Sequence, residues 1–231
     1  MNQQRQTLAI ILTRTDFGEA DRIITVLTPE QGKLRLMAKG VRRSKSKLAG
    51  GIELFSVSQL TYIPGRGEIG TLVSTRLDRH YGRIVQDIQR TMLGYEMTKL
   101  LHRNTEDIPE SDYFELLQQS FAALDESTLP LELISQWFTT QLIRLAGHTP
   151  NLRTDTAGAA LTADHKYNFD LEGMTFQNHP EGGFNANHIK LLRLLFSGTQ
   201  PQVIQKVQGI DELLAAVVPL VRTMAQTQLR A

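Results

Sequence analysis

The stretch Arg22-Ile-Ile-Thr-Val-Leu-Thr-Pro-Glu-Gln-Gly-Lys-Leu-Arg-Leu-Met-Ala38 contains two short segments rich in apolar and β-branched residues. Between them stands Pro29-Glu-Gln-Gly32, where proline presets the backbone of a turn and glycine can adopt a positive φ. Two strand-like segments joined by so short a loop predict a β-hairpin over residues 22–38.

The sequence around this hairpin continues the strand pattern. In Ser56-Val-Ser-Gln-Leu-Thr-Tyr-Ile63 apolar side chains recur at about every second position, as a half-buried strand requires. Further strands are expected at residues 8–13, 55–63 and 69–76, with Pro64-Gly-Arg-Gly67 as a second turn. Five short strands within about 75 residues predict a small closed barrel of the OB type, or a sandwich. We favour the barrel because closure removes the unpaired edges of a sheet.

From about Tyr81 the apolar residues follow a helical period. A first helix is expected to run to about His102 and to bury a face made of Ile84, Ile88, Met92, Tyr95 and Leu100. A second is expected to open at residues 107–112 and to bury Phe114, Leu117, Phe121 and Leu124. Further helices are expected at residues 131–146, 189–196 and 210–229, and Pro219 should kink or split the last of them.

The expected fold class is α+β, with an OB barrel in residues 1–80 and an α-helical domain in residues 81–231. Residues 148–184 form a poorly patterned insert within the helical domain, rich in Thr, Gly, Asn and Asp. Only residues 167–171 and 174–176 look like strands there, with Glu172-Gly173 between them as a two-residue hairpin turn.

Composition excludes several classes of site. The chain contains no cysteine, so disulfides, thiolate nucleophiles and thiolate metal sites are ruled out. No apolar run approaches the length of a membrane span, and the N-terminus lacks the plan of a secretion signal. We therefore expect a cytoplasmic protein.

Charge is unevenly distributed along the chain. Residues 1–90 hold 15 Lys and Arg against 8 Asp and Glu, a balance of +7, whereas residues 91–231 hold 10 against 16, a balance of −6. Such asymmetry between the two halves suggests that the first half meets a polyanion.

The basic charge concentrates in the segment from Lys33 to Lys47, which holds seven basic residues. No acidic residue occurs between Glu30 and Glu53. Alternate residues of a strand lie about 6.6–7 Å apart, which suits the phosphates of an extended single strand. The candidate nucleic-acid-binding residues are Lys33, Arg35, Lys39, Arg42, Arg43, Lys45 and Lys47, with Arg66 in the second turn. A solvated loop beside an edge strand is the alternative.

Aromatic residues that could stack on bases are few in this half of the chain. Only Phe17, Phe55 and Tyr62 lie near the basic segment in the sequence. We therefore expect binding to be led by contacts to the phosphate backbone rather than by base stacking.

The N-terminal block resembles the start of the RecO recombination-mediator family. It reads Glu19-Ala-Asp21, then Thr28-Pro-Glu-Gln-Gly32, then Ala38-Lys-Gly-Val-Arg42 followed by Ser44 and Ser46. That family shows an acidic residue, one residue and Asp before a strand, then Thr-x-Glu-x-Gly, then Ala-Lys-Gly with basic residues and Ser. The order and spacing agree over about 40 residues.

The resemblance implies an OB-fold N-terminus and a helical C-terminal domain in a cytoplasmic, nucleoid-associated protein. It implies binding to single- and double-stranded DNA and annealing of complementary strands. The implied partners are RecR and single-strand-binding protein, with which such a protein helps to load RecA. Lys39, Arg42 and Arg43 lie where the family carries its basic motif, so the resemblance assigns them to DNA contact.

Many members of that family carry a zinc site of paired Cys-x-x-Cys motifs after a Gly-x-x-Pro. Here Gly147-His-Thr-Pro150 is present, but Thr154 and Ala157 stand where the first cysteine pair would fall. The histidines at 148, 165, 179 and 188 are too widely spaced for close ligand pairs. We expect no metal and no cofactor, and an insert held together by its hairpin and by packing.

Patterns of catalytic sites are missing from the sequence, so we expect a protein without enzymatic activity. Glu19 and Asp21 lack a companion histidine or metal cluster, and the glycine pairs lack the Lys-Ser/Thr of a phosphate-binding loop. Two other interpretations stay open: an OB module that binds RNA or associates with the ribosome, and an adaptor whose basic loop meets an acidic partner tail.

Overall fold

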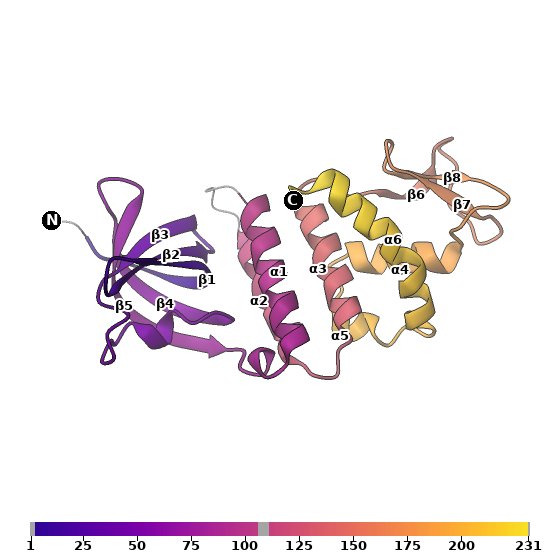
Figure 1. The fold of residues 1–231 in the computed structure, drawn as a ribbon. Helices are drawn as coiled ribbons and strands as arrows, with labels where there is room; N and C mark the ends of the chain where they lie inside the picture. The colour runs from indigo at the N-terminus through magenta and orange to yellow at the C-terminus, as the bar shows by residue number, and fades with distance from the viewer. Residues whose placement is uncertain (1–2, 106–110, 231) are drawn as a thin grey trace. The chain divides into compact units, whose positions relative to one another are not determined.

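The computed structural model describes residues 3–105 and 111–230 (Figure 1). It divides into two compact units, Met1–Ser127 and Thr128–Ala231, which are described separately. The first unit contains the barrel and the first two helices, so the division lies beyond residue 80, where the barrel ends.

The barrel of the first unit is built from five strands (Figure 1). They are β1 (Arg5–Phe17), β2 (Asp21–Thr28), β3 (Gly32–Ala38), β4 (Ser56–Ile63) and β5 (Ile69–His80). The sheet closes in the order β1-β2-β3-β5-β4, with β3 and β5 parallel and the other neighbours antiparallel. The expected OB-type barrel is therefore confirmed.

The predicted hairpin of residues 22–38 forms with Arg22 opposite Ala38 and Thr28 opposite Gly32. Its turn is closed by the Thr28 hydroxyl, which donates to the Gly32 carbonyl at 2.9 Å and accepts from the Gln31 amide at 3.2 Å. Gly32 has a φ of +65°, which a residue with a Cβ adopts only at a cost. The inner side chains of these strands, among them Ile24, Val26 and Leu36, are buried in the barrel core.

The β1–β2 hairpin extends beyond the barrel core. A register shift between Ile11 and Thr13 marks a bulge, and residues 15–19 after it are exposed. The ladder nevertheless continues to the pairs Asp16–Arg22 and Phe17–Asp21. The segment from Asp16 to Asp21, here called the hairpin tip, therefore projects into solvent.

Helix α1 (Ile88–Asn104), which follows a short 3-10 turn at Ile84–Gln86, does not bury the expected face. Ile84 is buried, but the exposed fractions of Ile88, Met92 and Tyr95 are 73%, 57% and 50%. The residues of α1 that are buried instead are Arg90, Gly94, Met97, Thr98 and Leu101. The predicted face was therefore wrong for most of its length.

The reason lies in Phe55, which precedes β4 and has a φ of +55°. A Cβ on Gly94 would lie 2.6 Å from the Phe55 ring, so only glycine lets the ring approach the helix backbone this closely. Phe55 also packs edge-on against Tyr95 and against Phe121, with ring centroids 5.2 and 5.3 Å apart. A small residue and not an apolar stripe thus decides which side of α1 faces the barrel.

Helix α2 (Ser111–Asp125) follows the prediction. Its four expected inner residues, Phe114, Leu117, Phe121 and Leu124, are all buried. The predicted start of this helix at residues 107–110 lies outside the described residues.

The second unit contains four helices among its described residues. They are α3 (Leu131–Leu145), α4 (Ala186–Phe196), α5 (Pro201–Ile204) and α6 (Ile210–Gln228). Helix α6 continues through Pro219, so the expected splitting does not occur. The short helix α5 was not anticipated. Within the described residues, no helix combines the length and apolar character needed to cross a bilayer.

The insert forms a small sheet in the order β6-β8-β7, from β6 (Asn151–Asp155), β7 (Tyr167–Asp170) and β8 (Thr175–Asn178). The turn between β7 and β8 spans residues 171–174, not the expected two, and the Asp170 carboxylate accepts from the Glu172 and Gly173 amides. Phe176 is fully buried and packs edge-on against Tyr167, Phe169 and Phe184. The hairpin and this aromatic cluster hold the insert together.

Candidate nucleic-acid interface

The basic segment after β3, residues 39–47, is here called the basic loop, and it is fastened to the hairpin tip. Gly40, at a φ of +65°, donates its amide to the Asp21 carboxylate at 2.7 Å. The Arg42 amide donates to the Ala20 carbonyl at 2.9 Å. Asp21 and Gly40 thus hold the start of the loop on the tip, which gives a physical reason for the pairing of Asp21 with Ala38-Lys-Gly40 in the sequence motif.

Two arginines share one carboxylate at this place. The Arg22 Nε lies 2.7 Å from one oxygen of Asp16, and the Arg42 Nε lies 3.5 Å from the other. The hydrogen bond from Arg22, helped by the charges of Arg42 and Arg14, holds the pKa of Asp16 below its ordinary value. Arg14 itself pairs with Glu53 at 3.0 Å. Positive charge exceeds negative charge in this cluster.

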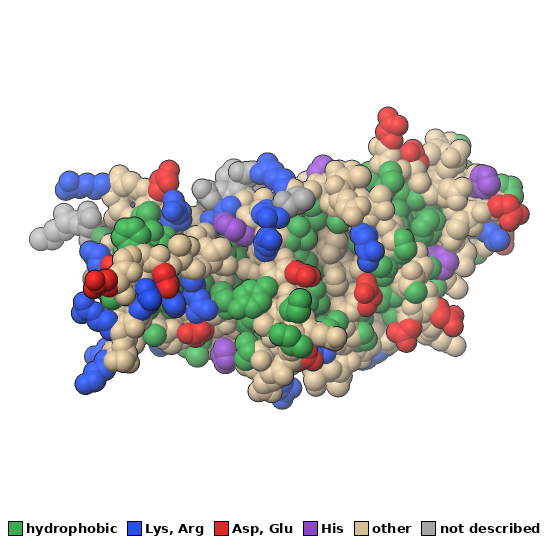
Figure 2. Space-filling view, in the orientation of Figure 1, with side chains coloured by type: hydrophobic (Ala, Val, Ile, Leu, Met, Phe, Trp, Pro, Cys, Tyr) green, Lys and Arg blue, Asp and Glu red, His purple; other side chains and the backbone are tan. Residues whose placement is uncertain are grey.

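The basic loop presents its charges to solvent. Lys39, Arg42, Arg43, Lys45 and Lys47 are all exposed. Its backbone is nonetheless ordered by turns, since the Arg43 amide donates to Gly40 and the Ser46 amide to Arg43. Figure 2 shows Lys and Arg side chains gathered around the barrel. Exposed cations on an ordered loop are suited to contact a phosphate backbone.

Arg35 and Arg66 lie elsewhere on the barrel surface. Arg35 projects from β3 and forms a 3.5 Å ion pair with Glu68. Glu68 belongs to the β4–β5 turn, which also carries the exposed Arg66. These two arginines therefore lie at β3 and the β4–β5 turn of the barrel. The basic loop lies instead at the hairpin tip between β1 and β2.

Lys33 is used differently from the other candidates. Its ammonium donates to the carbonyls of His102 and Thr105, at 3.3 and 2.5 Å. These carbonyls lie at the C-terminal end of α1, where the helix dipole favours a cation. Lys33 thus fastens the barrel to α1, and its charge is already partly neutralised within the fold.

Arg14 and Arg22 are basic residues flanking the hairpin tip that the sequence did not single out. Arg22 was visible only as the first residue of a predicted strand, and Arg14 as an isolated charge. The pairing of Asp16 with Arg22 across the hairpin could have pointed to Arg22, because opposite charges on paired residues of neighbouring strands attract. With them, the candidate interface comprises Arg14, Arg22, Lys39, Arg42, Arg43, Lys45 and Lys47.

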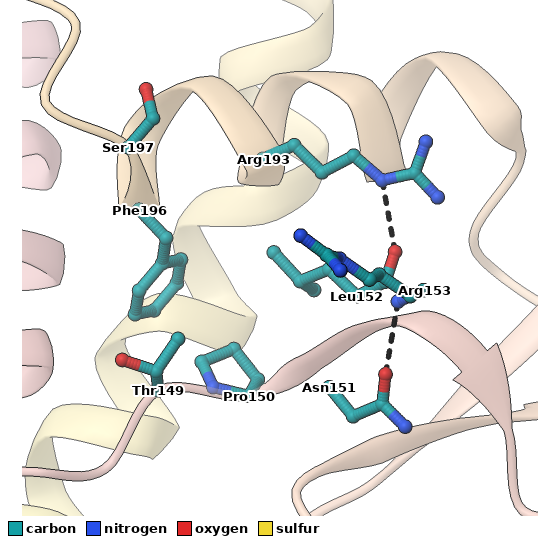
Figure 3. A pocket seen from close by; sticks show the side chains of 8 residues that line it. All are labelled: Thr149, Pro150, Asn151, Leu152, Arg153, Arg193, Phe196 and Ser197. Carbon is teal, nitrogen blue, oxygen red and sulfur yellow. Dashed lines mark hydrogen bonds between the residues drawn. The ribbon is translucent and has the colours of Figure 1, made fainter.

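A cavity of about 730 Å³ lies in the second unit between α4 and β6 (Figure 3). Phe196, Thr149 and Pro150 lie together at one end, and Arg193 reaches toward Leu152, whose carbonyl accepts from its Nε at 2.9 Å. Arg153 is the second charged residue of the lining, which contains no Asp, Glu or His. The cavity therefore offers no carboxylate or imidazole for acid–base catalysis.

Three histidines, His165 and His179 in the insert and His188 just after it, form local side-chain bonds. His165 Nδ1 bonds the Thr162 hydroxyl at 2.9 Å, and His179 Nδ1 accepts from the Glu181 amide at 3.2 Å. His188 and Asn185 form a capping box at the start of α4. Within the described residues, no group of three or more His, Asp or Glu is placed to hold a metal ion.

We predict that the protein contains no structural zinc, because it lacks cysteine and its insert is closed by aromatic packing. Metal analysis of untagged protein should find no stoichiometric zinc, and a chelator should leave the melting temperature unchanged. One zinc per chain, or a lower melting temperature in chelator, would show that histidines from separate segments form a site.

The comparisons with known proteins agree with this fold. Residues 1–80 match the family model described as Recombination protein O N terminal. The chain is similar to DNA repair protein RecO of Dehalococcoides mccartyi, 34% identical over 64% of this chain and 58% of that protein. It is similar to the proteins of that name from Halalkalibacterium halodurans, 29% identical over 81% and 75% of the two chains, and from Roseiflexus sp., 36% over 68% and 55%.

The matched region thus covers somewhat more than half the length of the first of these relatives. The family model covers Asp21, Gly32 and Gly40, whose bonds and backbone angles shape the barrel. The barrel, the motif and the sequence matches point the same way: the chain belongs to the RecO family.

Proposed function

We propose that this protein acts in DNA repair and recombination by binding single- and double-stranded DNA on the basic surface of its barrel and annealing complementary strands. The observation that carries the proposal is the basic loop held against the hairpin tip, where Asp21 binds the Gly40 amide and Asp16 binds Arg22 and Arg42. Relatives named DNA repair protein RecO support the assignment to repair.

The proposed mechanism is neutralisation of charge without chemistry. Two single strands repel each other through their phosphates, and exposed arginines and lysines lower that repulsion by replacing condensed counterions. The five exposed cations of the basic loop and Arg22 beside the hairpin tip lie on one ordered structure, so they can serve several phosphates at once. Base pairing then supplies the free energy of annealing, and no nucleotide hydrolysis is required.

The family relationship also suggests the partners of this step. We propose that the protein works with RecR and with single-strand-binding protein, and that the three together help to load RecA on single-stranded DNA. Because DNA coated with single-strand-binding protein cannot pair freely, a protein that anneals strands in the cell must engage the coated strand.

Two alternatives follow from the same basic surface. An OB barrel that recognises RNA would bind RNA at least as tightly as DNA and would not accelerate annealing. An adaptor would bind an acidic protein tail with the basic loop and would show little affinity for nucleic acid at physiological salt.

A salt series tests the proposal and decides between these alternatives. In a gel-shift assay with single-stranded DNA, duplex DNA and RNA of equal length, DNA binding should fall steeply with salt. Each neutralised phosphate adds about −0.7 to the slope of the log–log plot for single strands, so six contacts give about −4. A flat plot would contradict the electrostatic mechanism, and tighter RNA binding without annealing would favour the RNA module.

A further inference from the structure

Phe17 differs from the other aromatic residues of the barrel. The aromatic side chains of residues 3–80 are Phe17, Phe55 and Tyr62. Phe55 and Tyr62 are buried, with exposed fractions of 2% and 3%, whereas Phe17 is 53% exposed at the projecting end of β1. Phe55 and Tyr62 belong to the packed interior, and among these three residues only Phe17 exposes its ring to solvent.

Phe17 lies between two residues that contact Arg42, and its partner on β2 is Asp21, whose carboxylate binds the Gly40 amide. The preceding residue, Asp16, binds the Nε atoms of Arg22 and Arg42. The following residue, Gly18, accepts a hydrogen bond from Arg42 Nη1 at 3.4 Å through its carbonyl. Single exposed apolar side chains are common on protein surfaces. Phe17, however, stands between Asp16 and Gly18, the two residues that the Arg42 side chain contacts.

A ring exposed on the same end of the hairpin as the Arg22 and Arg42 guanidinium groups matches the chemistry of a single strand. The ring offers a π face for a base, and the arginines offer donors for the phosphate of the same or the adjoining nucleotide. In a duplex the bases are already stacked and paired, so their faces are closed to the ring. The arrangement therefore distinguishes single-stranded from double-stranded nucleic acid.

We propose that Phe17 stacks on a base of the bound single strand and gives the interface its preference for single strands over duplex. This inference rests on the proposed function, since it requires that the hairpin tip and basic loop bind nucleic acid. It adds a base contact to a surface whose other contacts are to phosphates.

The test compares oligo(dT) with an abasic strand of the same length, which retains the sugar-phosphate backbone and lacks bases. Wild-type protein should prefer oligo(dT). Phe17→Ala should lose between about 5-fold and about 150-fold in affinity for oligo(dT), the range observed for stacked bases, and should bind the abasic strand and duplex DNA as the wild type does. Phe17→Leu, which keeps an apolar side chain but has no π face, should behave like Phe17→Ala.

Phe17→Trp supplies an independent signal. The one native tryptophan, Trp137, is 1% exposed and donates its indole N–H to the Thr199 carbonyl, so it reports little on ligands. A tryptophan at 17 should retain the affinity for oligo(dT), and its emission should be quenched by oligo(dT) but not by the abasic strand.

The outcomes separate this inference from the proposed function. If wild-type protein binds neither strand, the proposed function fails. If it binds oligo(dT) and the abasic strand equally, and Phe17→Ala changes neither, DNA binding stands and the stacking role is wrong. A loss in Phe17→Ala that is equal for oligo(dT), the abasic strand and duplex would also overturn the stacking role, since the ring would then act only by shaping the hairpin tip.

Discussion

Replacing Lys39, Arg42 and Arg43 together by alanine should remove most strand annealing while the barrel stays folded. If each of the three side chains serves one phosphate, the slope of the log–log salt plot for single strands should become shallower by about 2. Phosphate contacts of this kind contribute almost nothing to the affinity at 1 M salt. A slope that is shallower by about 2 therefore lowers the affinity at 0.1 M salt by about 100-fold. Annealing of complementary oligonucleotides, followed by fluorescence, should slow correspondingly.

The fold should tolerate this change because the three side chains lie on the surface. Lys39 and Arg43 are exposed, and Arg42 contributes only the exposed pair with Asp16 and one long bond to Gly18. Exposed ion pairs contribute about 0–1 kcal/mol to stability. Asp16 also keeps its 2.7 Å bond to Arg22. The melting temperature should therefore move little.

A matched control removes three exposed cations from the second unit, by Lys166→Ala, Lys190→Ala and Arg222→Ala. Arg193 is unsuitable for this control because its Nε is bonded to the Leu152 carbonyl. The control protein should bind and anneal like the wild type. If the control loses annealing and the barrel variant keeps it, the DNA surface lies on the second unit and the site assignment is wrong.

Replacing Arg90 by methionine should destabilise the first unit more than any exposed substitution in it. Arg90 is only 8% exposed, and its guanidinium donates to the carbonyls of Leu124, Glu126 and Ser127 at 2.9 to 3.0 Å. These carbonyls lie at the C-terminal end of α2 and just beyond it. Methionine fills the space of the side chain but leaves the acceptors without these donors, at a cost of about 3 kcal/mol.

Urea unfolding followed by circular dichroism measures this effect as a lower transition midpoint of the first unit. Arg90→Lys should rescue little, because one ammonium cannot reproduce the planar fork of donors. Arg83→Met is the matched control, since the Arg83 side chain is exposed and its bonds to Asp125 and Gln86 are made by its backbone. Equal midpoints for Arg90→Met and the control would show that water replaces the guanidinium at no cost.

The strands and the basic loop could be predicted because their signals are local. The hairpin of residues 22–38 follows from two apolar segments and a turn that needs Gly32 at positive φ. The buried face of α2 follows from the spacing of Phe114, Leu117, Phe121 and Leu124. The cations from Lys39 to Lys47 are exposed after the end of a strand, while the apolar Val41 among them is buried in the barrel core.

The same local reasoning failed where a distant residue decides the environment. The face of α1 was wrong because Phe55 packs against Gly94, some forty residues away, and draws the polar and small side of the helix inward. In the sequence Lys33 resembled the other charges of a basic strand. In the structure its ammonium donates hydrogen bonds to the carbonyls of His102 and Thr105. The inclusion of α1 and α2 in the barrel unit depends on such contacts too.

The sequence by itself determined the hairpin of residues 22–38, the family motif and the chemical character of the basic loop. Hydrophobic periodicity, turn residues and runs of charge involve residues that are close together in the chain, so they can be read from the sequence. Only the tertiary structure decided that Asp16 joins Arg22 to Arg42, that Lys33 binds the end of α1, and that Phe17 alone among the barrel aromatics is exposed. These features arise where segments far apart in the sequence meet, and burial and pairing there depend on geometry that no local pattern encodes.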